Sequence, residues 1–542
     1  RDRRKSLVGS EMCIRDRTVT VQAGKEPSFT ADGEGVTATV ERAGDGIFRA
    51  QLSGVAPDAR ILAMGGAKPA AAIPLRGATT AEAPFNDWAV YHIMMAYFAN
   101  GAAANDRAGM RKWVHRNYAG GDLQGVLSKA DYIADLGVNA VWLSPIFQSE
   151  TSHGYDVQNY YRVSDALAVP GEPEASLALL RQLRDALGER GVGVVLDVPL
   201  NHAARSYDKR SGDPNRLRPR GTRAKQEAEK VWEGWNAGFQ YWNFGDEDTR
   251  RFLTEVAMYW LNDEQMAGLR LDYVRGVPHD YWAELYAAVK AERPDAILFG
   301  EAWKDADGPT GNMTDIANYY AEVPGVGYQF DSLIEFPLQM VMTDVFAKGG
   351  DATQLERWLQ ATEAAYGDHG APIYFLDNHD TARFADFATD RPDERIAAAV
   401  AFMATLPGPM IVYYGTETGL AGSTPQRGFT DTNRYPMPWD DLDESLVARV
   451  RDAIVLKRKT PVLNRGSRLP VFADETGVVM ARVLDDDVAL VAVNTGPEAR
   501  TIEFECPAGA GFEALLGPAP AGADGRWRWE LPGLSTAVAV GQ

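Results

Sequence analysis

The hydrophobic residues of this chain recur in two patterns between about residues 87 and 460. Short apolar segments such as AVYHIMMAYF, AVWLSP and GVVLDVPL alternate with longer stretches such as EASLALLRQLRDALGERG, in which apolar residues recur every three or four positions. The short runs indicate buried strands, and the three-to-four spacing indicates amphipathic helices. Seven clear strands of this kind are joined by a weaker eighth at YQFDSLIEF. Because strand–helix–strand repeats build a parallel sheet covered by helices, residues 87–460 are predicted to form an α/β fold, a (β/α)8 TIM barrel.

The chain on either side of this region alternates polar and apolar residues, which is typical of half-buried strands. Segments such as TVTVQAG and GIFRAQLSG predict a small N-terminal β module over residues 18–66, and an Ala- and Pro-rich linker follows over residues 67–86. Segments such as VVMARVLDD and VALVAVNTG predict a C-terminal antiparallel β-sandwich over residues 461–542. The predicted barrel therefore lies between two smaller all-β domains.

The first residues follow neither pattern. The segment RKSLVGSEMCIRDR, residues 4–17, resembles the translated read-through of a sequencing adapter, so we expect residues 1–17 to be non-native. A targeting signal could have been lost with the native N-terminus. The sequence therefore assigns no compartment.

Composition narrows the range of partners. The 542 residues include 75 acidic and 55 basic ones, and the resulting net charge of −20 argues against a polyanionic partner such as nucleic acid. An uncharged ligand would be indifferent to this charge. Only Cys13 and Cys506 are present, so neither a disulfide framework nor a CxxC zinc site is expected. No apolar run is long enough to cross a bilayer.

Polar and charged residues gather at the ends of four predicted strands. In a barrel of this kind the carboxyl ends of the strands converge on one mouth, where catalytic residues lie. Each strand end alone also fits a structural role; Arg270 and Asp272, for example, share one strand face and could form a buried ion pair. Four polar ends at regular strand–helix spacing favour a functional site instead. The residues at these ends are Asp197, Asn201, His202, Arg270, Asp272, Glu301, His379 and Asp380.

Glycoside cleavage uses side chains of these types. The reaction needs one ionised carboxylate beside the sugar carbon and one protonated carboxyl group beside the leaving oxygen. Arg270 lies on the same strand face as Asp272 and would hold that carboxylate ionised. Glu301 is flanked by Phe299 and Trp303, an apolar setting that raises the pKa of a carboxyl group. We interpret Asp272 as a nucleophile with its charge partner, and Glu301 as the acid.

Four segments, LDVPLNH, GLRLDYVRG, FGEAW and FLDNHD, resemble in this order the signature regions of glycoside hydrolase family 13, the α-amylase family. The resemblance extends through HGYDVQNYY, PGPMIVYYGTETGL and NRYPMPWD and covers residues from about 88 to 440. In character it is nearest to neopullulanase, cyclomaltodextrinase and maltogenic amylase-like enzymes. It implies a retaining glycosidase that cleaves α-1,4-glucosidic bonds in maltooligosaccharides, starch-type glucans or cyclodextrins through a covalent glycosyl-enzyme.

The same resemblance implies roles for individual residues. Asp272 would be the nucleophile, Glu301 the general acid/base, and Asp380 the third carboxylate, which orients the sugar. In a retaining enzyme the nucleophile and the acid should lie about 5–5.5 Å apart. The residues implied to bind the substrate are Tyr155, Asp156, His202, Arg270, His379 and Arg434.

The domain plan of the family implies a domain inserted after the third strand, at about residues 203–245. Its aromatic residues could stack on sugar rings, although aromatics are also ordinary packing material. They include Trp232, Trp235, Tyr241 and Trp242. The N-terminal β module matches in position a module of neopullulanases and cyclomaltodextrinases, and homodimerisation through it is an expectation from the family.

The chemistry requires no cofactor, but the resemblance leaves a structural calcium ion open. Where calcium-binding members have DRFANGDPSND, this chain has AYFANGAAAND, so Ala96 and Ala102 replace two expected carboxylates. Calcium needs about 6–8 oxygen ligands, and the remaining Asn and Asp residues of this segment make a poor cage. A second calcium site of the family uses the asparagine that matches Asn201.

Two other functions stay open. A transglycosylase or sugar isomerase of the same family would keep the covalent intermediate but pass the glucosyl unit to another sugar, and the sequence does not separate it from a hydrolase. A non-catalytic carbohydrate-binding or interaction protein, like the amylase-like heavy subunits of amino-acid transporters, belongs to another class. Those proteins carry a membrane span and lack parts of the carboxylate set, whereas this chain has Asp272, Glu301 and Asp380.

Overall fold

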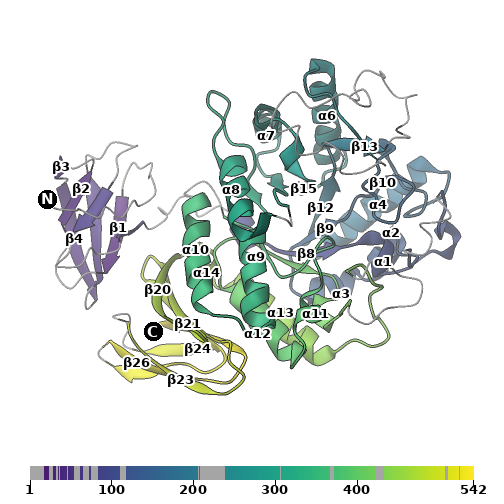
Figure 1. The fold of residues 1–542 in the computed structure, drawn as a ribbon. Coiled ribbons are helices and arrows are strands. Elements are labelled where there is room, and N and C mark those ends of the chain that lie inside the picture. Colours follow the sequence, from purple (N-terminus) through teal and green to yellow (C-terminus); the bar gives the residue numbers. More distant parts are fainter. Residues whose placement is uncertain are drawn as a thin grey trace.

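The computed structural model described here covers most of the chain (Figure 1). It describes residues 17–541 with gaps at 23–27, 32–33, 36, 45–46, 54–60, 65–71, 75–83, 110–117, 205–206, 208–238, 305–306, 367–370, 423–432, 507–510 and 524. Most of the predicted inserted domain, with Trp232 and Trp235, lies outside the described residues. Among the described helices, none combines the length and the apolar character that a bilayer span needs.

Eight parallel strands form the central sheet. They are hydrogen-bonded in the order β17-β16-β15-β12-β9-β8-β19-β18. A parallel bridge between Ile334, after β17, and Ile373, before β18, joins the two ends of this order. The barrel is therefore closed, the predicted (β/α)8 fold class is confirmed, and the weaker strand signal at YQFDSLIEF corresponds to β17. The strands are β8 (Ala89–Ile93), β9 (Ala140–Leu143), β12 (Gly193–Val198), β15 (Gly268–Leu271), β16 (Ile297–Gly300), β17 (Ser332–Leu333), β18 (Tyr374–Phe375) and β19 (Met410–Tyr413).

Helices connect successive strands and cover the outside of the barrel (Figure 1). The longer ones follow the predicted spacing: α4 begins with Pro173 and buries Leu177, Leu180, Leu183 and Leu187 on one face. The helices are α1 (Met95–Phe98), α2 (Leu123–Ser128), α3 (Ala130–Asp135), α4 (Pro173–Gly188), α6 (Glu247–Met258), α7 (His279–Glu292), α8 (Gly308–Tyr320), α9 (Phe336–Met342), α10 (Thr353–Tyr366), α11 (Phe384–Phe387), α12 (Pro392–Ala404), α13 (Glu444–Lys459) and α14 (Pro461–Arg465).

Apolar side chains fill the inside of the barrel. Because side chains alternate along a strand, every second residue points inward, and the inward residues form a layer separate from the larger core beneath the helices. This inner cluster includes Val90, Ala140, Trp142, Val195, Ile297, Phe299, Ile373, Phe375 and Ile411. The barrel is thus a packed core, and polar chemistry is confined to the strand ends.

Two short hairpins lie on the loops that follow the barrel strands. β10 (Phe147–Gln148) pairs with β11 (Asn159–Val163), and β13 (His202–Ala204) pairs with β14 (Phe239–Tyr241). The second hairpin brackets the undescribed segment 208–238 and aligns His202 with Tyr241. It therefore fixes where the predicted inserted domain joins the barrel.

The N-terminal module consists of antiparallel strands in two sheets, ordered β4-β5-β1-β7 and β3-β2-β6. Its last strand lies within the residues expected as a linker, because β7 pairs with β1 through Val19 and Pro74. The strands are β1 (Arg17–Gln22), β2 (Ser28–Ala31), β3 (Glu34–Gly35), β4 (Thr37–Gly44), β5 (Ile47–Ser53), β6 (Ile61–Met64) and β7 (Ala72–Pro74).

The C-terminal domain is the predicted β-sandwich. One sheet has the order β20-β21-β22-β27-β24 and the other β23-β26-β25. In β26, Trp527, Trp529 and Leu531 are buried between the sheets while the intervening residues are exposed, which is the alternation expected of a half-buried strand. The strands are β20 (Ser467–Asp474), β21 (Gly477–Leu484), β22 (Asp487–Asn494), β23 (Arg500–Glu505), β24 (Phe512–Leu516), β25 (Ala521–Ala523), β26 (Arg526–Leu531) and β27 (Ser535–Gly541).

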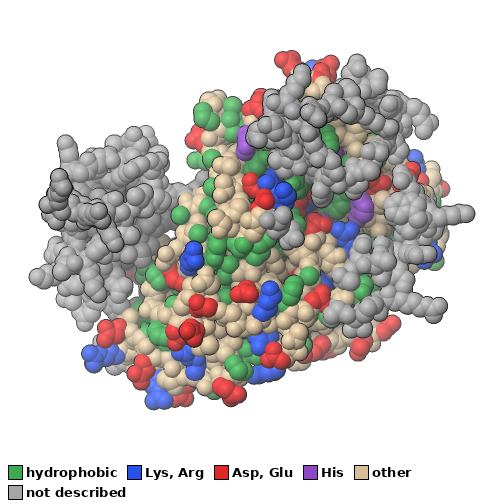
Figure 2. Space-filling view, in the orientation of Figure 1, with side chains coloured by type: hydrophobic (Ala, Val, Ile, Leu, Met, Phe, Trp, Pro, Cys, Tyr) green, Lys and Arg blue, Asp and Glu red, His purple; other side chains and the backbone are tan. Residues whose placement is uncertain are grey.

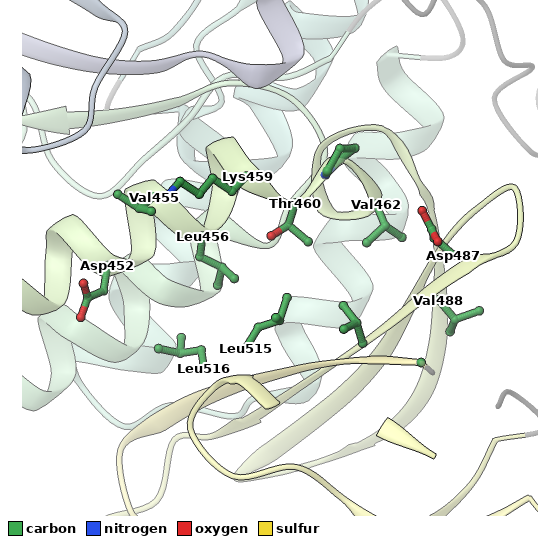
Figure 3. A pocket seen from close by; sticks show the side chains of 13 residues that line it. Asp452, Val455, Leu456, Lys459, Thr460, Val462, Asp487, Val488, Leu515 and Leu516 are labelled. Atoms are coloured by element: carbon green, nitrogen blue, oxygen red, sulfur yellow. The ribbon is translucent and has the colours of Figure 1, made fainter. Parts of the chain in front are cut away.

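A groove of about 580 Å³ lies between α13 and the β-sandwich (Figure 3). Its lining is mostly apolar and includes Leu456, Val488, Leu515 and Leu516. On the face shown in Figure 2, acidic and basic side chains intermingle over the lower part of the molecule. None of the polar strand-end residues lines the groove, so the candidate chemistry lies elsewhere.

Candidate active site

The register of the parallel strands places the polar residues at the strand ends at the same height along the barrel axis. Asp197 of β12 pairs with Arg270 of β15, and Arg270 pairs with Phe299 of β16, two residues before Glu301. Asp272 and Glu301 directly follow their strands, and the backbone N–H of Glu301 donates to the oxygen of Leu271 at 3.1 Å. Neighbouring strands therefore present Asp197, Arg270, Asp272 and Glu301 side by side.

The guanidinium of Arg270 is the centre of this group. Its Nη1 donates to Asp197 Oδ1 and to Asp272 Oδ1, each at 2.8 Å, and its Nη2 forms an ion pair with Glu301 Oε1 at 2.6 Å. The Arg270 side chain is fully buried, and its Cζ lies over the Trp142 ring, 5.1 Å from the ring centroid. A buried pair of this kind seldom improves stability over apolar packing, and here one cation faces three carboxyl groups. The arrangement is therefore suited to chemistry.

Glu301 is buried, and polar groups contact both oxygens of its carboxyl group. The residue is 2% exposed, and its Oε2 accepts a hydrogen bond from the backbone N–H of Tyr273 at 3.1 Å. Burial raises the pKa of Glu301 above its ordinary value, the Arg270 guanidinium opposes this rise, and the Asp272 carboxylate adds to it. Glu301 therefore keeps its proton where an exposed glutamate would lose it.

Asp380 differs from Glu301 because about a third of its side chain is exposed. Its Oδ2 lies 3.1 Å from His379 Nε2, and its Oδ1 accepts from Arg434 Nη2 at 3.0 Å. Burial raises the pKa of Asp380, but His379 and Arg434 outweigh burial and hold this pKa below its ordinary range. Arg434 Nε also donates to the His379 backbone oxygen at 2.8 Å, so one arginine binds both neighbours.

The predicted substrate-binding residues fall into two groups. Tyr155 and His379 join the carboxylate cluster: the Tyr155 hydroxyl donates to Asp197 Oδ2 at 2.8 Å and contacts His379 Nε2. His202 lies directly beside them, with Nε2 3.0 Å from the Tyr155 backbone oxygen. Asp156 instead accepts from the Thr151 hydroxyl and the Glu150 N–H, so its carboxylate is used within its own loop.

Sequence reasoning missed several members of this site. Asp197 was placed at a strand end without a role, yet its carboxylate accepts from Trp142 Nε1 at 3.1 Å, from Tyr155 and from Arg270. His92 of β8 stacks on Trp142 with ring centroids 3.5 Å apart and meets His379 edge-on. The alternation of side chains along β8, β9 and β12 predicts that these residues point into the barrel. It does not predict which residues they contact there.

The aromatic residues assigned to the inserted domain are only partly described. Trp242 is 2% exposed and packs against Tyr160, Phe252 and Tyr207, so it serves as packing material. Tyr241 lies on β14, half-buried beside β13.

Asn201 stays a predicted calcium ligand, and among the described residues its amide nitrogen contacts backbone oxygens only. Its Nδ2 donates to the backbone oxygens of Asp272 at 3.2 Å and Tyr273 at 3.0 Å, so the nearest carbonyl oxygens are already used by an N–H donor. Asn201 Oδ1 is buried without a hydrogen-bond partner among the described residues. No group of three or more Asp, Glu, His or Cys side chains suited to a metal ion occurs in the described part of the chain. We therefore derive no step through calcium.

Comparison with protein families and curated proteins gives consistent matches. The family model "Alpha amylase, catalytic domain" matches residues 92–240 and 233–450. The chain is 28% identical to a cyclomaltodextrinase of a Bacillus species over 437 residues, which are 76% of this chain and 73% of that protein. It is 27% identical to neopullulanase 2 of Thermoactinomyces vulgaris over 480 residues, covering 82% of this chain and 77% of the relative.

Solved structures agree with these matches. The α-amylase of Geobacillus thermoleovorans, complexed with acarbose, superposes with a TM-score of 0.72 at 27% identity and covers 84% of this chain and 98% of its own. An Anoxybacillus α-amylase gives a TM-score of 0.73 at 26% identity with the same coverage. A cyclomaltodextrinase structure covers 98% of this chain and 95% of its own with a TM-score of 0.72, and at 22% identity it supports the fold alone. Since the family model spans most of the barrel, the chain belongs to the α-amylase family.

Proposed function

We propose that this protein is a retaining glycoside hydrolase that cleaves α-1,4-glucosidic bonds in maltooligosaccharides, starch-type glucans or cyclodextrins. The observation that carries the proposal is the buried Arg270 guanidinium, which contacts the Asp272 carboxylate and the Glu301 carboxyl group at once. Relatives named cyclomaltodextrinase, neopullulanase and maltogenic amylase support the substrate class.

The first step breaks the glycosidic bond. Asp272 carries an ion pair with Arg270 and, as a carboxylate, attacks the anomeric carbon of the sugar. The bond between this carbon and the leaving oxygen breaks while Glu301 gives its proton to that oxygen. The product of the step is a glycosyl ester on Asp272 together with a released sugar, and Glu301 is left as a carboxylate.

The second step hydrolyses the ester. The ionised Glu301 takes a proton from a water molecule, whose oxygen attacks the same carbon from the face that the released sugar has left. The bond to Asp272 breaks and its carboxylate is restored. The net reaction consumes one water, and two displacements at one carbon retain its configuration.

The residues around the carboxylates would hold the sugar in place. Tyr155, His379 and His202 form a polar wall beside Asp197: the Tyr155 hydroxyl contacts Asp197 and His379, and His202 contacts the Tyr155 backbone oxygen. Asp380 keeps an exposed carboxylate next to this wall, in a position to accept hydrogen bonds from sugar hydroxyls. Arg434 fixes both Asp380 and the His379 backbone, so we assign it the orientation of this carboxylate.

Product analysis tests the proposal. The purified protein and its Asp272→Asn variant are incubated with maltoheptaose, β-cyclodextrin, pullulan and soluble starch, and products are sampled over time. We expect the native protein to release maltose and glucose and the variant to release neither. The preferred glucan then assigns the subtype.

Two outcomes would lead to another function. Oligosaccharides longer than the substrate, formed at high acceptor concentration, would indicate transfer to sugars in place of water. A folded native protein that degrades none of the four glucans would contradict the hydrolase proposal and leave a carbohydrate-binding protein as the next reading. Homodimerisation stays a prediction, and a sizing column that returns only monomer would contradict it.

A further inference from the structure

The turn that follows the nucleophile has an unusual backbone. Tyr273 has φ 35° and ψ 72°, in the left-handed region, although it is not a glycine. Bulky residues rarely adopt this conformation, and they keep it only where the surroundings enforce it. Strained residues of this kind concentrate at functional sites, and Tyr273 lies directly between Asp272 and the 3-10 turn Val274–Gly276.

Several side chains hold the turn in this shape. Asn201 is 2% exposed, and its Nδ2 donates to two backbone oxygens, those of Asp272 and Tyr273. These two oxygens precede and follow the Tyr273 Cα. On the far side, Arg275 forms ion pairs with Asp307 and Asp315, both at 3.1 Å, which tie the turn to α8. The turn is thus held by Asn201 from the loop after β12 and by the ion pairs of Arg275 from helix α8, which follows β16.

The turn determines the surroundings of Glu301. The N–H of Tyr273 donates to Glu301 Oε2 at 3.1 Å, and the N–H of Val274 donates to the Glu301 backbone oxygen at 2.9 Å. Arg270 meets the other carboxyl oxygen, Oε1. Both oxygens of Glu301 are therefore fixed, one by a buried guanidinium and one by a backbone N–H whose direction depends on the left-handed φ of Tyr273.

We propose that Asn201 is a positioning residue for the general acid: it holds the left-handed turn whose Tyr273 N–H orients the Glu301 carboxyl group toward the leaving oxygen. The inference rests on the proposed function. It gives the Asn201 amide a role in placing the acid. The carboxylate of the nucleophile Asp272 accepts from Arg270, and Asn201 contacts only the backbone of that residue.

Leaving-group dependence distinguishes this role from a merely structural one. Fluoride departs from an anomeric carbon without a proton, whereas the sugar oxygen of maltotriose needs one, so only maltotriose depends on a correctly placed acid. The quantity kcat/KM reports steps up to bond cleavage. For Asn201→Ala we expect kcat/KM to fall by about 100-fold on maltotriose, within the range attributed to general acids, and by about threefold or less on α-maltosyl fluoride.

A matched control is available at the base of the barrel. Asn464 is 1% exposed, donates to the Lys457 backbone oxygen at 2.7 Å and to Asp87 Oδ1 at 3.1 Å, and its Oδ1 has no partner in the described structure, as in Asn201. Asn464→Ala should therefore cost comparable packing and leave the ratio of the two kcat/KM values unchanged. If Asn201→Ala lowers both values equally, the positioning role is refuted.

A second variant removes the hydrogen bond without changing a side chain. Incorporation of 4-hydroxyphenyllactate at position 273 replaces the Asp272–Tyr273 amide by an ester, so the N–H toward Glu301 is lost. We expect the same selective loss on maltotriose, and an unchanged ratio would overturn the inference even if Asn201→Ala does not fold. Failure of the native protein to cleave either substrate would instead contradict the proposed function.

Discussion

At the scale of single residues, the site depends on contrasting environments for similar groups. Glu301 is almost fully buried, whereas Asp380 is a third exposed and lies between His379 and Arg434. Burial favours the neutral form of a carboxyl group, and adjacent cations or hydrogen-bond donors favour the charged form. The pKa of Glu301 is therefore raised and the pKa of Asp380 is lowered. This contrast is expected where a protonated acid, Glu301, works beside an ionised carboxylate, Asp380.

The pH profile of kcat/KM tests the acid assignment. Burial raises the pKa of Glu301 to about 8, so the acid stays protonated through neutral pH and loses its proton only in the alkaline range. We expect kcat/KM on maltotriose to fall on the alkaline side only well above pH 4.3, which is about the ordinary pKa of a glutamate. In Glu301→Gln this alkaline decline should disappear and kcat should fall by about 10²- to 10⁴-fold. A decline near pH 5, or one unchanged in the variant, would contradict the assignment.

The residue types at the strand ends were predictable, but their partners were not. Arg270 and Asp272 stand two positions apart in one strand, so their shared face follows from alternation alone. The contacts of Asp197 with Trp142 and Tyr155 span 55 and 42 positions and depend on strand order. The left-handed turn at Tyr273 could not be predicted, because local propensity disfavours it and distant side chains impose it.

At the scale of elements, hydrogen bonds organise residues 99–106, the loop in which Ala102 replaces an expected carboxylate. The Asp122 carboxylate caps α2 by accepting from Gly125 N at 2.6 Å, and it also accepts from Gly101 N, Ala102 N and Asn105 Nδ2. Donors therefore surround the oxygens that a cation would need. The loop is held between the end of α1 and α2 by these bonds.

Chelation should have no effect on this loop. Because backbone and amide donors already satisfy Asp122, we expect the melting temperature to be the same, within about 1 °C, in excess EDTA and in millimolar calcium chloride. Differential scanning calorimetry provides the measurement. A melting temperature that rises by several degrees with calcium would show that a bound cation stabilises the fold.

The elements themselves were largely predictable because their periodicities differ so clearly. The eight strands appear where apolar runs end in turns, and α4 buries the leucines that recur every three or four residues. Strand β7 was missed because its three residues sit in an Ala- and Pro-rich segment and become a strand only by pairing with β1. Pairing between distant segments leaves no local signal.

At the scale of the whole molecule, two basic side chains are buried where the barrel meets the β-sandwich. Lys457 of α13 is fully buried and donates through Nζ to the Leu406 oxygen at 3.0 Å. Arg482 of β21 is also fully buried and donates to the backbone oxygens of Thr405 and Gly466. Arg482 thereby fastens the end of α12 to the sandwich, and Lys457 fastens the next residue to α13.

Lys457 should therefore make stability depend on pH. Burial and the nearby Arg482 lower its pKa from about 10.5 to about 7, so the folded state binds fewer protons than the unfolded state between these values. The cost of burying this residue is absent above pH 10.5 and grows as pH falls to 7. For Lys457→Met, we expect the melting temperature relative to the native protein to be higher at pH 7 than at pH 10, by about 2 °C or more.

The neighbouring lysine supplies the control. Lys459 is exposed at the end of the same helix, so Lys459→Met should give the same difference from the native protein at both pH values. The hydrogen bond that Lys457→Met loses to Leu406 costs stability at every pH, so only the change between the two pH values reports the pKa. If Lys457→Met shows no such change, this lysine is not a buried neutral base.

The most direct test of the account is to identify the residue that carries the covalent intermediate. A 5-fluoro-α-glycosyl fluoride slows both steps through the ring fluorine, while its fluoride leaving group keeps the first step faster, so the glycosyl-enzyme accumulates. Peptide mass spectrometry of the labelled native protein should locate one sugar on Asp272, and Asp272→Asn should remain unlabelled. A label on another residue, or native protein that turns over glucans with inversion and without any label, would contradict the account.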